Sequence, residues 1–165
     1  MVLATHLVTG AVLGQVISNP ALALFSGFIS HFLLDAIPHW DYHLASLETN
    51  PDDKLDTKMA LNRDFIFDLA KISLDLIIGV TVLFLTFKFL NWQINASVIL
   101  AALGAIIPDF LQFAYFKLRW PILRWLQAFH VWIHAVKRLD NRMILGPLLQ
   151  AIVALSVITL AGGLL

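Results

Sequence analysis

The sequence contains no cysteine, which excludes disulfides and leaves only nitrogen and oxygen ligands for any metal ion. Charge is also scarce: Asp, Glu, Lys and Arg make up 13% of the 165 residues, against about 25% in soluble domains. Because the formal net charge is zero, the chain lacks the basic surface of a nucleic-acid-binding protein, and we expect no nucleic acid partner. Glycine-rich phosphate loops, Gly-x-Ser-x-Gly elbows and His-Glu-x-x-His motifs are all missing from the sequence.

Apolar sequence is abundant instead. Hydrophobic residues make up 59% of the chain, and the mean hydropathy is +0.82. This composition predicts an all-α polytopic membrane protein, with about five transmembrane or re-entrant helices in a single integral membrane domain over residues 1–165. The expected apolar segments are 2–17, 21–37, 65–90, 94–118 and 143–164. Residues 119–142 predict one amphipathic interfacial helix, which would contact membrane lipid.

The basic residues indicate an orientation. If all five segments cross the membrane, the loops 38–64 and 117–142 lie on the same side as the N-terminus. That side carries nine Lys and Arg residues, whereas the other side carries only Lys88. The nine are Lys54, Lys58, Arg63, Lys117, Arg119, Arg124, Lys137, Arg138 and Arg142. Because cytoplasmic loops are enriched in Lys and Arg, we expect this side to face the cytoplasm.

The most informative stretch runs from His31 to His43, at the end of the second apolar segment. It contains three histidines and two aspartates within thirteen residues. Ionisable groups at such a position are costly to bury and usually serve a function. Imidazoles and carboxylates are ligands of divalent Zn, Mn and Fe. We therefore predict a site for one or two divalent metal ions, with His31, Asp35, His39 and Asp41 as ligands.

Other ionisable residues fall in the same half of the expected bundle. His6 lies near the start of the first segment, and His130 and His134 have the i, i+4 spacing by which one helix can supply two ligands. We add these three histidines to the predicted metal ligands. Asp75 and Asp109 lie within the third and fourth segments, and we predict a catalytic role for them, as general base or as orienting groups.

Structural explanations for the same residues stay open. Pro38 forces a helix break, so the polar residues around it could form a simple interfacial turn. Asp75 and Lys71 could be an ion pair that orders the bundle. His130 and His134 could anchor their helix among aromatic side chains instead of binding metal.

Short motifs also indicate a family. The opening Thr5-His6-Leu-Val-Thr-Gly10 resembles the Thr-His-x-x-x-Gly opening of the membrane-bound metal-dependent hydrolases, the YdjM-like small inner-membrane proteins. That family has a Pro-Asp-x-Asp-His motif after its second helix, and Pro38-His39-Trp40-Asp41 occupies the equivalent place here. The family's later His-Arg-Gly-x-Thr-His-Ser motif has only a partial counterpart in Phe129-His130-Val-Trp-Ile-His134. The resemblance implies a protein of the prokaryotic inner (plasma) membrane with a metal site that faces the cytoplasm.

The leading functional hypothesis is a membrane-embedded, metal-dependent hydrolase. A site at the level of the lipid headgroups suits a lipid-like substrate, such as a lipid ester or phosphoester. One alternative is a component of a proton or metal-ion transporter or channel, although a pathway needs polar groups across the full membrane depth. Another is a non-catalytic membrane protein stapled by a structural metal. The oligomeric state stays open.

Overall fold

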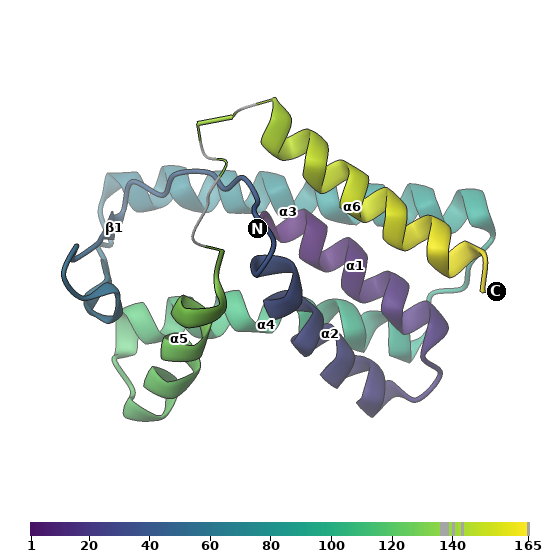
Figure 1. Cartoon of the computed structure of the whole chain (residues 1–165), viewed down its shortest axis with the longest axis horizontal. Coiled ribbons are helices and arrows are strands. Elements are labelled where there is room, and N and C mark those ends of the chain that lie inside the picture. The colour runs from purple at the N-terminus through teal and green to yellow at the C-terminus, as the bar shows by residue number, and fades with distance from the viewer. Residues whose placement is uncertain (136–138, 140, 143, 165) are drawn as a thin grey trace.

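The computed structural model describes residues 1–135, 139, 141–142 and 144–164, and these form a helical protein with one very short hairpin (Figure 1). In chain order the elements are α1 (Leu3–Val16), α2 (Pro20–Asp35), β1 (Leu47–Glu48), the 3₁₀ turn η1 (Lys54–Asp56), β2 (Lys58–Met59), α3 (Arg63–Leu90), α4 (Ala96–Leu118), α5 (Pro121–Ile133) and α6 (Leu145–Gly162). The predicted all-α class is confirmed.

Three of these helices, α3, α4 and α6, are long and apolar enough to cross a membrane. The helices α1 and α2 are apolar but have only 14 and 16 residues, which is about 21 and 24 Å of helix. Both fall short of the ~30 Å hydrocarbon core of a bilayer. The three longer helices have the length and composition expected of an integral membrane protein.

Local sequence signals set the helix ends. Asn19 caps α2 by accepting hydrogen bonds from the backbone N–H groups of its first turn at 3.0 Å, and Pro20 takes the first helical position, where its missing donor does no harm. Asn62 and Asn95 cap α3 and α4 in the same way. The helix α3 ends at Asn91, which has the left-handed backbone conformation common at helix C-termini.

The helix α1 is the centre of the bundle and contacts α2, α3, α4 and α6 (Figure 1). Glycines allow the close approach of its neighbours. A Cβ atom on Gly10 would lie 2.5 Å from the carbonyl oxygen of Ala101 in α4, and one on Gly14 would overlap the backbone of Ser97. The two glycines, four residues apart, therefore give α1 a face without side chains on which α4 packs closely.

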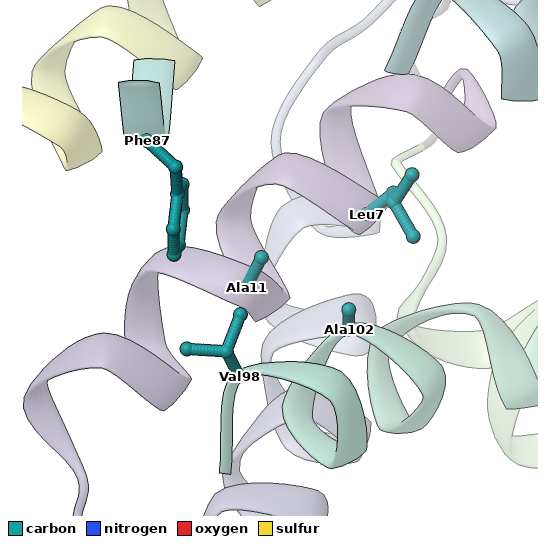
Figure 2. Close-up of a cluster of buried hydrophobic side chains, with 5 residues drawn as sticks. All are labelled: Leu7, Ala11, Phe87, Val98 and Ala102. Atoms are coloured by element: carbon teal, nitrogen blue, oxygen red, sulfur yellow. The ribbon is translucent and has the colours of Figure 1, made fainter. Parts of the chain in front are cut away.

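One end of the bundle, which holds the C-terminal half of α1, is filled by apolar side chains. Figure 2 shows Phe87 of α3 and Val98 of α4 pointing toward each other past Ala11 of α1, and Leu7 and Ala102 belong to the same buried cluster. A second cluster joins α1 to α6. It is formed by Val8, Val12 and Ala161, with Leu83, Trp92, Ala154, Val157 and Ile158 packed against it.

The predicted interfacial helix over 119–142 is shorter than expected. The helix α5 begins at Pro121 and ends at Ile133, and Lys137 and Arg138 lie outside the described residues. The side chains of Ile122, Trp125 and Trp132 are strongly exposed on α5. The hairpin lies beside the junction of α4 and α5, because Arg119 donates hydrogen bonds to the carbonyl oxygens of Leu55 and Thr57.

Candidate metal-binding site

The polar cluster is positioned by the close packing of α2 on α4. A Cβ atom on Gly27 would overlap the backbone of Ala101, so the two helices touch there. One turn further along both helices, Nδ1 of His31 donates a hydrogen bond to the carbonyl oxygen of Ala105 at 2.8 Å. After one more turn Asp35 ends α2. Glycine, histidine and aspartate at a spacing of four thus share one helix face and are directed at α4.

His6 reaches the same point from α1. Gly10, one turn further along α1, packs on the backbone of α4, which brings His6 to the level of His31. The two imidazole rings stack with their centroids 4.0 Å apart. Nε2 of His6 lies 3.2 Å from Oδ1 of Asp35, and Nδ1 has no hydrogen-bond partner among the described residues. A fully buried imidazole without a partner on one nitrogen is costly in a purely structural role.

The carboxylate of Asp35 is the centre of the cluster, and its side chain is 2% exposed. Its Oδ1 atom accepts a hydrogen bond from the α-amino group of Met1 at 2.6 Å and also lies near His6 and His39. Its Oδ2 atom lies 3.2 Å from Nε2 of His31 and 2.9 Å from Nε2 of His130. Four histidines from three helices and one loop thus surround a single carboxylate.

Hydrogen bonds to backbone carbonyls fix the orientation of two of these rings. A carbonyl oxygen can only accept, so Nδ1 of His31 must carry a proton toward Ala105, and Nδ1 of His39 must carry one toward Ile37 at 2.7 Å. In the neutral rings both Nε2 lone pairs are then directed toward Asp35. A lone pair 3.2 Å from a carboxylate oxygen, as at His31, is stabilised by a shared cation, either a proton or a metal ion. A backbone carbonyl behind the ring is also the usual arrangement of a metal-bound histidine.

Among the described residues, three overlapping groups of side chains have ligand atoms within 4.8 Å of one another: His6, His31 and Asp35; His31, Asp109 and His130; and Asp35, His39 and His134. In a tetrahedral zinc site with bonds of 2.0–2.1 Å, neighbouring ligand atoms are roughly 3.3 Å apart. Nε2 of His31 lies 3.4 Å from Nε2 of His130 and 3.6 Å from Oδ1 of Asp109. These buried groups could therefore hold a metal ion.

The predicted site residues differ in how closely they approach this cluster. His130 and His134, the predicted pair, belong to two different groups. The reason is that α5 ends at Ile133, and His134 follows it with an extended backbone conformation. Oδ2 of Asp41 lies 4.0 Å from the α-amino group of Met1, and Asp41 belongs to none of the three groups found among the described residues. Its role as a ligand stays a prediction.

Asp75 lies on α3 and contacts the start of α1. Its carboxylate accepts hydrogen bonds from the backbone N–H groups of Leu3 and Ala4, at 2.6 and 3.3 Å. Asp75 therefore holds the first turn of α1, and with it the start of the helix that carries His6. This contact fits the predicted orienting role, and a direct catalytic role of Asp75 stays a prediction.

Sequence reasoning missed the α-amino group of Met1 and two side chains among the polar partners of the site. The side-chain amide of Gln112 lies 3.5 Å from Nδ1 of His130, and the hydroxyl of Tyr42 lies 3.4 Å from Oδ2 of Asp75. Burial and the nearby charges of Asp75, Asp41 and Asp109 raise the pKa of Tyr42 well above its usual value near 10. An amide within an apolar segment is the signal that could have identified Gln112.

Comparison of the chain with protein-family models, curated proteins and solved structures gives no match. The class of the protein therefore rests on its fold and its site. It is an all-α protein with three helices that could cross a membrane, and with buried histidine and aspartate groups that could hold a metal ion.

Proposed function

We propose that this protein is a membrane-embedded, metal-dependent hydrolase. The observation that carries the proposal is the set of imidazole nitrogens around Oδ2 of Asp35. Nε2 of His31 and Nε2 of His130 both lie within 3.2 Å of this oxygen, and both rings are buried. One or two divalent ions, such as Zn, Mn or Fe, would satisfy all of these atoms together.

An accessible group beside the buried ligands favours catalysis over a purely structural metal. The side chain of Asp109 is 34% exposed, whereas His31, 3.6 Å away, is 0% exposed. A bound divalent ion would supply hydroxide at neutral pH by lowering the pKa of bound water from 15.7 toward ~7. In this proposal Asp109 would accept a proton from such a water, and His6, His31 and Asp35 would bind the ion. Asp75 orients α1 and thereby His6.

The lengths of the helices support a lipid as substrate. The helices α1 and α2 run from the apolar end of the bundle to the polar cluster, and they measure about 21 and 24 Å. With one end at a membrane surface, the cluster would lie within roughly 10 Å of the opposite boundary of the ~30 Å hydrocarbon core. The ester bonds of membrane lipids lie at this boundary, and their phosphoester bonds lie just outside it. The basic loops on the same side support a cytoplasmic orientation in a prokaryotic inner membrane.

The transporter alternative has less support, because the apolar end of the bundle is filled with packed side chains such as Phe87 and Val98. A structural metal would require a closed coordination sphere, which the exposed carboxylate of Asp109 does not favour.

The direct test is elemental analysis of protein purified in mild detergent, followed by turnover assays with lipid phosphoesters and acyl esters in mixed micelles. We expect one or two equivalents of Zn, Mn or Fe, and hydrolysis that chelation abolishes and the same metal restores. No bound metal after reconstitution with each of the three ions would overturn the proposal. Bound metal without turnover on either lipid class would favour the structural alternative.

A further inference from the structure

The polar cluster is largely buried, and the carboxylate of Asp109 is partly exposed. His6, His31 and Asp35 are fully buried, and Asp109 on α4 is the member that is partly exposed. The hydroxyl of Tyr42 lies 3.4 Å from Oδ2 of Asp75 on α3. Asp75 and Asp109 thus belong to two helices that could cross a membrane.

The same two helices enclose an apolar groove of about 280 Å³ further along the bundle. Val80 and Phe84 of α3 line one wall, Ile99 and Leu103 of α4 line the other, and Ala11 of α1 forms the floor. Figure 2 shows four of the residues that line this groove, Ala11, Phe87, Val98 and Ala102, as members of the buried cluster.

The groove leads toward the polar cluster. Ala102 lines the groove, and Asp109 lies seven residues later on the same face of α4, about 10 Å along the helix axis. Two apolar side chains fill the interval, since Leu76, next to Asp75, and Ile106 both pack against the buried cluster around Ala11. The face of α4 from Val98 to Asp109 is therefore an apolar track, of which the part up to Leu103 is an open groove and the rest is occupied by Leu76 and Ile106.

The surroundings and the length of this track indicate its occupant. Both walls belong to helices that could cross a membrane, so the groove would open into lipid hydrocarbon and not into water. From Val98 to Asp109 the track measures about 16 Å, close to the ~15 Å depth of one leaflet. A single acyl chain in one leaflet has this reach, with its polar linkage at the end where Asp109 lies.

We propose that the groove between α3 and α4 holds an acyl chain of a membrane lipid whose ester or phosphoester linkage lies beside Asp109, so that substrate enters sideways from the bilayer. The identification of this lipid as the substrate rests on the proposed hydrolase function. The presence of a lipid chain in the groove does not.

The test is photolabelling of the full chain in nanodiscs that contain phosphatidylglycerol with a diazirine on one acyl chain. Peptide mass spectrometry then compares labelling of the groove residues Ile99 and Leu103 with that of Leu155 and Leu160 on α6, which are similarly exposed apolar residues outside the groove lining. A diazirine-bearing alkane without a headgroup serves as the second probe. We expect preferential labelling of the groove by the phospholipid and even labelling by the alkane.

Two variants sharpen the test. Leu103→Trp fills the groove from an exposed position and should reduce its labelling to the level of α6, whereas Leu155→Trp, the matched control on α6, should leave groove labelling unchanged. Even labelling of groove and α6 by the phospholipid, or groove contacts made only by a second copy of this chain, would overturn the proposal.

Metal content measured on the same samples separates the two proposals. Preferential labelling of the groove in protein that binds no metal would leave the lipid site standing and would remove the hydrolase assignment.

Discussion

The two ends of α1 are held in different ways. At its start, individual polar partners hold the helix: Asp75 accepts its first N–H groups, and His6 lies against Asp35. At its other end, Ala11 and Val12 are held by packing alone, against side chains of α3, α4 and α6. The comparison separates specificity from stability. A polar partner is defined by one atom and its distance, whereas an apolar neighbour is defined by shape and can be exchanged for another of similar volume.

The largest expected effect is at the polar end. Asp35→Asn keeps the shape of the side chain but removes the anionic oxygens that face four histidines. We expect metal affinity to fall by more than about 100-fold, since even the loss of an outer partner of a ligand typically costs 10–100-fold. Metal content by elemental analysis measures this. Asp52→Asn, on the exposed loop, is the matched control and should retain the metal. Full metal content in the Asp35 variant would remove this residue from the site.

The apolar end should show the opposite behaviour. Phe87→Ala removes a buried ring from the cluster between α1, α3 and α4, and we expect unfolding to become easier by roughly 3 kcal/mol, with metal affinity unchanged. Thermal unfolding in detergent and metal titration measure the two quantities. Phe89→Ala, two residues further on and strongly exposed, should leave both unchanged. A marked loss of metal affinity in Phe87→Ala would show that the two ends are not independent.

A smaller effect is expected from a partner of a ligand. Gln112→Leu removes the amide that lies 3.5 Å from Nδ1 of His130. We expect metal affinity to fall about 10–100-fold, because a ligand ring without its outer partner is less well oriented. Competition with a chelator of known affinity gives the constant. Gln93→Leu is the control, because Gln93 is exposed in the loop between α3 and α4. This substitution should have no effect on metal affinity. Equal affinities of the Gln112 variant and the wild type would mean that His130 needs no such support.

The smallest effect concerns Tyr42, which bridges the loop after α2 and Asp75. Its pKa is raised by burial and by neighbouring carboxylates, so the folded state keeps the proton while the unfolded state loses it above pH 10. Wild-type stability should therefore fall as the pH rises above 10, by less than the full ~1.4 kcal/mol per pH unit because the ring is partly exposed.

Tyr42→Phe should weaken this alkaline loss and leave stability at pH 7 within about 1 kcal/mol of the wild type. Denaturation at pH 7, 10 and 11 compares the two proteins. Parallel stability curves for the variant and the wild type over this range would contradict the burial of the phenol among carboxylates.

Much of the fold follows from the sequence. The apolar segments predicted the long helices α3, α4 and α6, and Asn19 with Pro20 marked the start of α2. The end of α5 did not follow from the sequence. The amphipathic pattern over 119–142 does not mark the residue at which the helix ends. The helix ends at Ile133, and His134 continues in an extended conformation toward another group of ligands.

By itself the sequence determined that histidines and aspartates gather in one half of the bundle, because helix length and spacing place His6, His31, Asp35 and Asp109 at related depths. Only the tertiary structure decided which atoms meet. The contact of Gly27 with α4 sets the register that directs His31 at Ala105, and the same folding ties Asp75 to the first turn of α1. The physical reason is that spacing fixes the face and depth of a side chain, whereas the choice of partner depends on how closely two backbones approach.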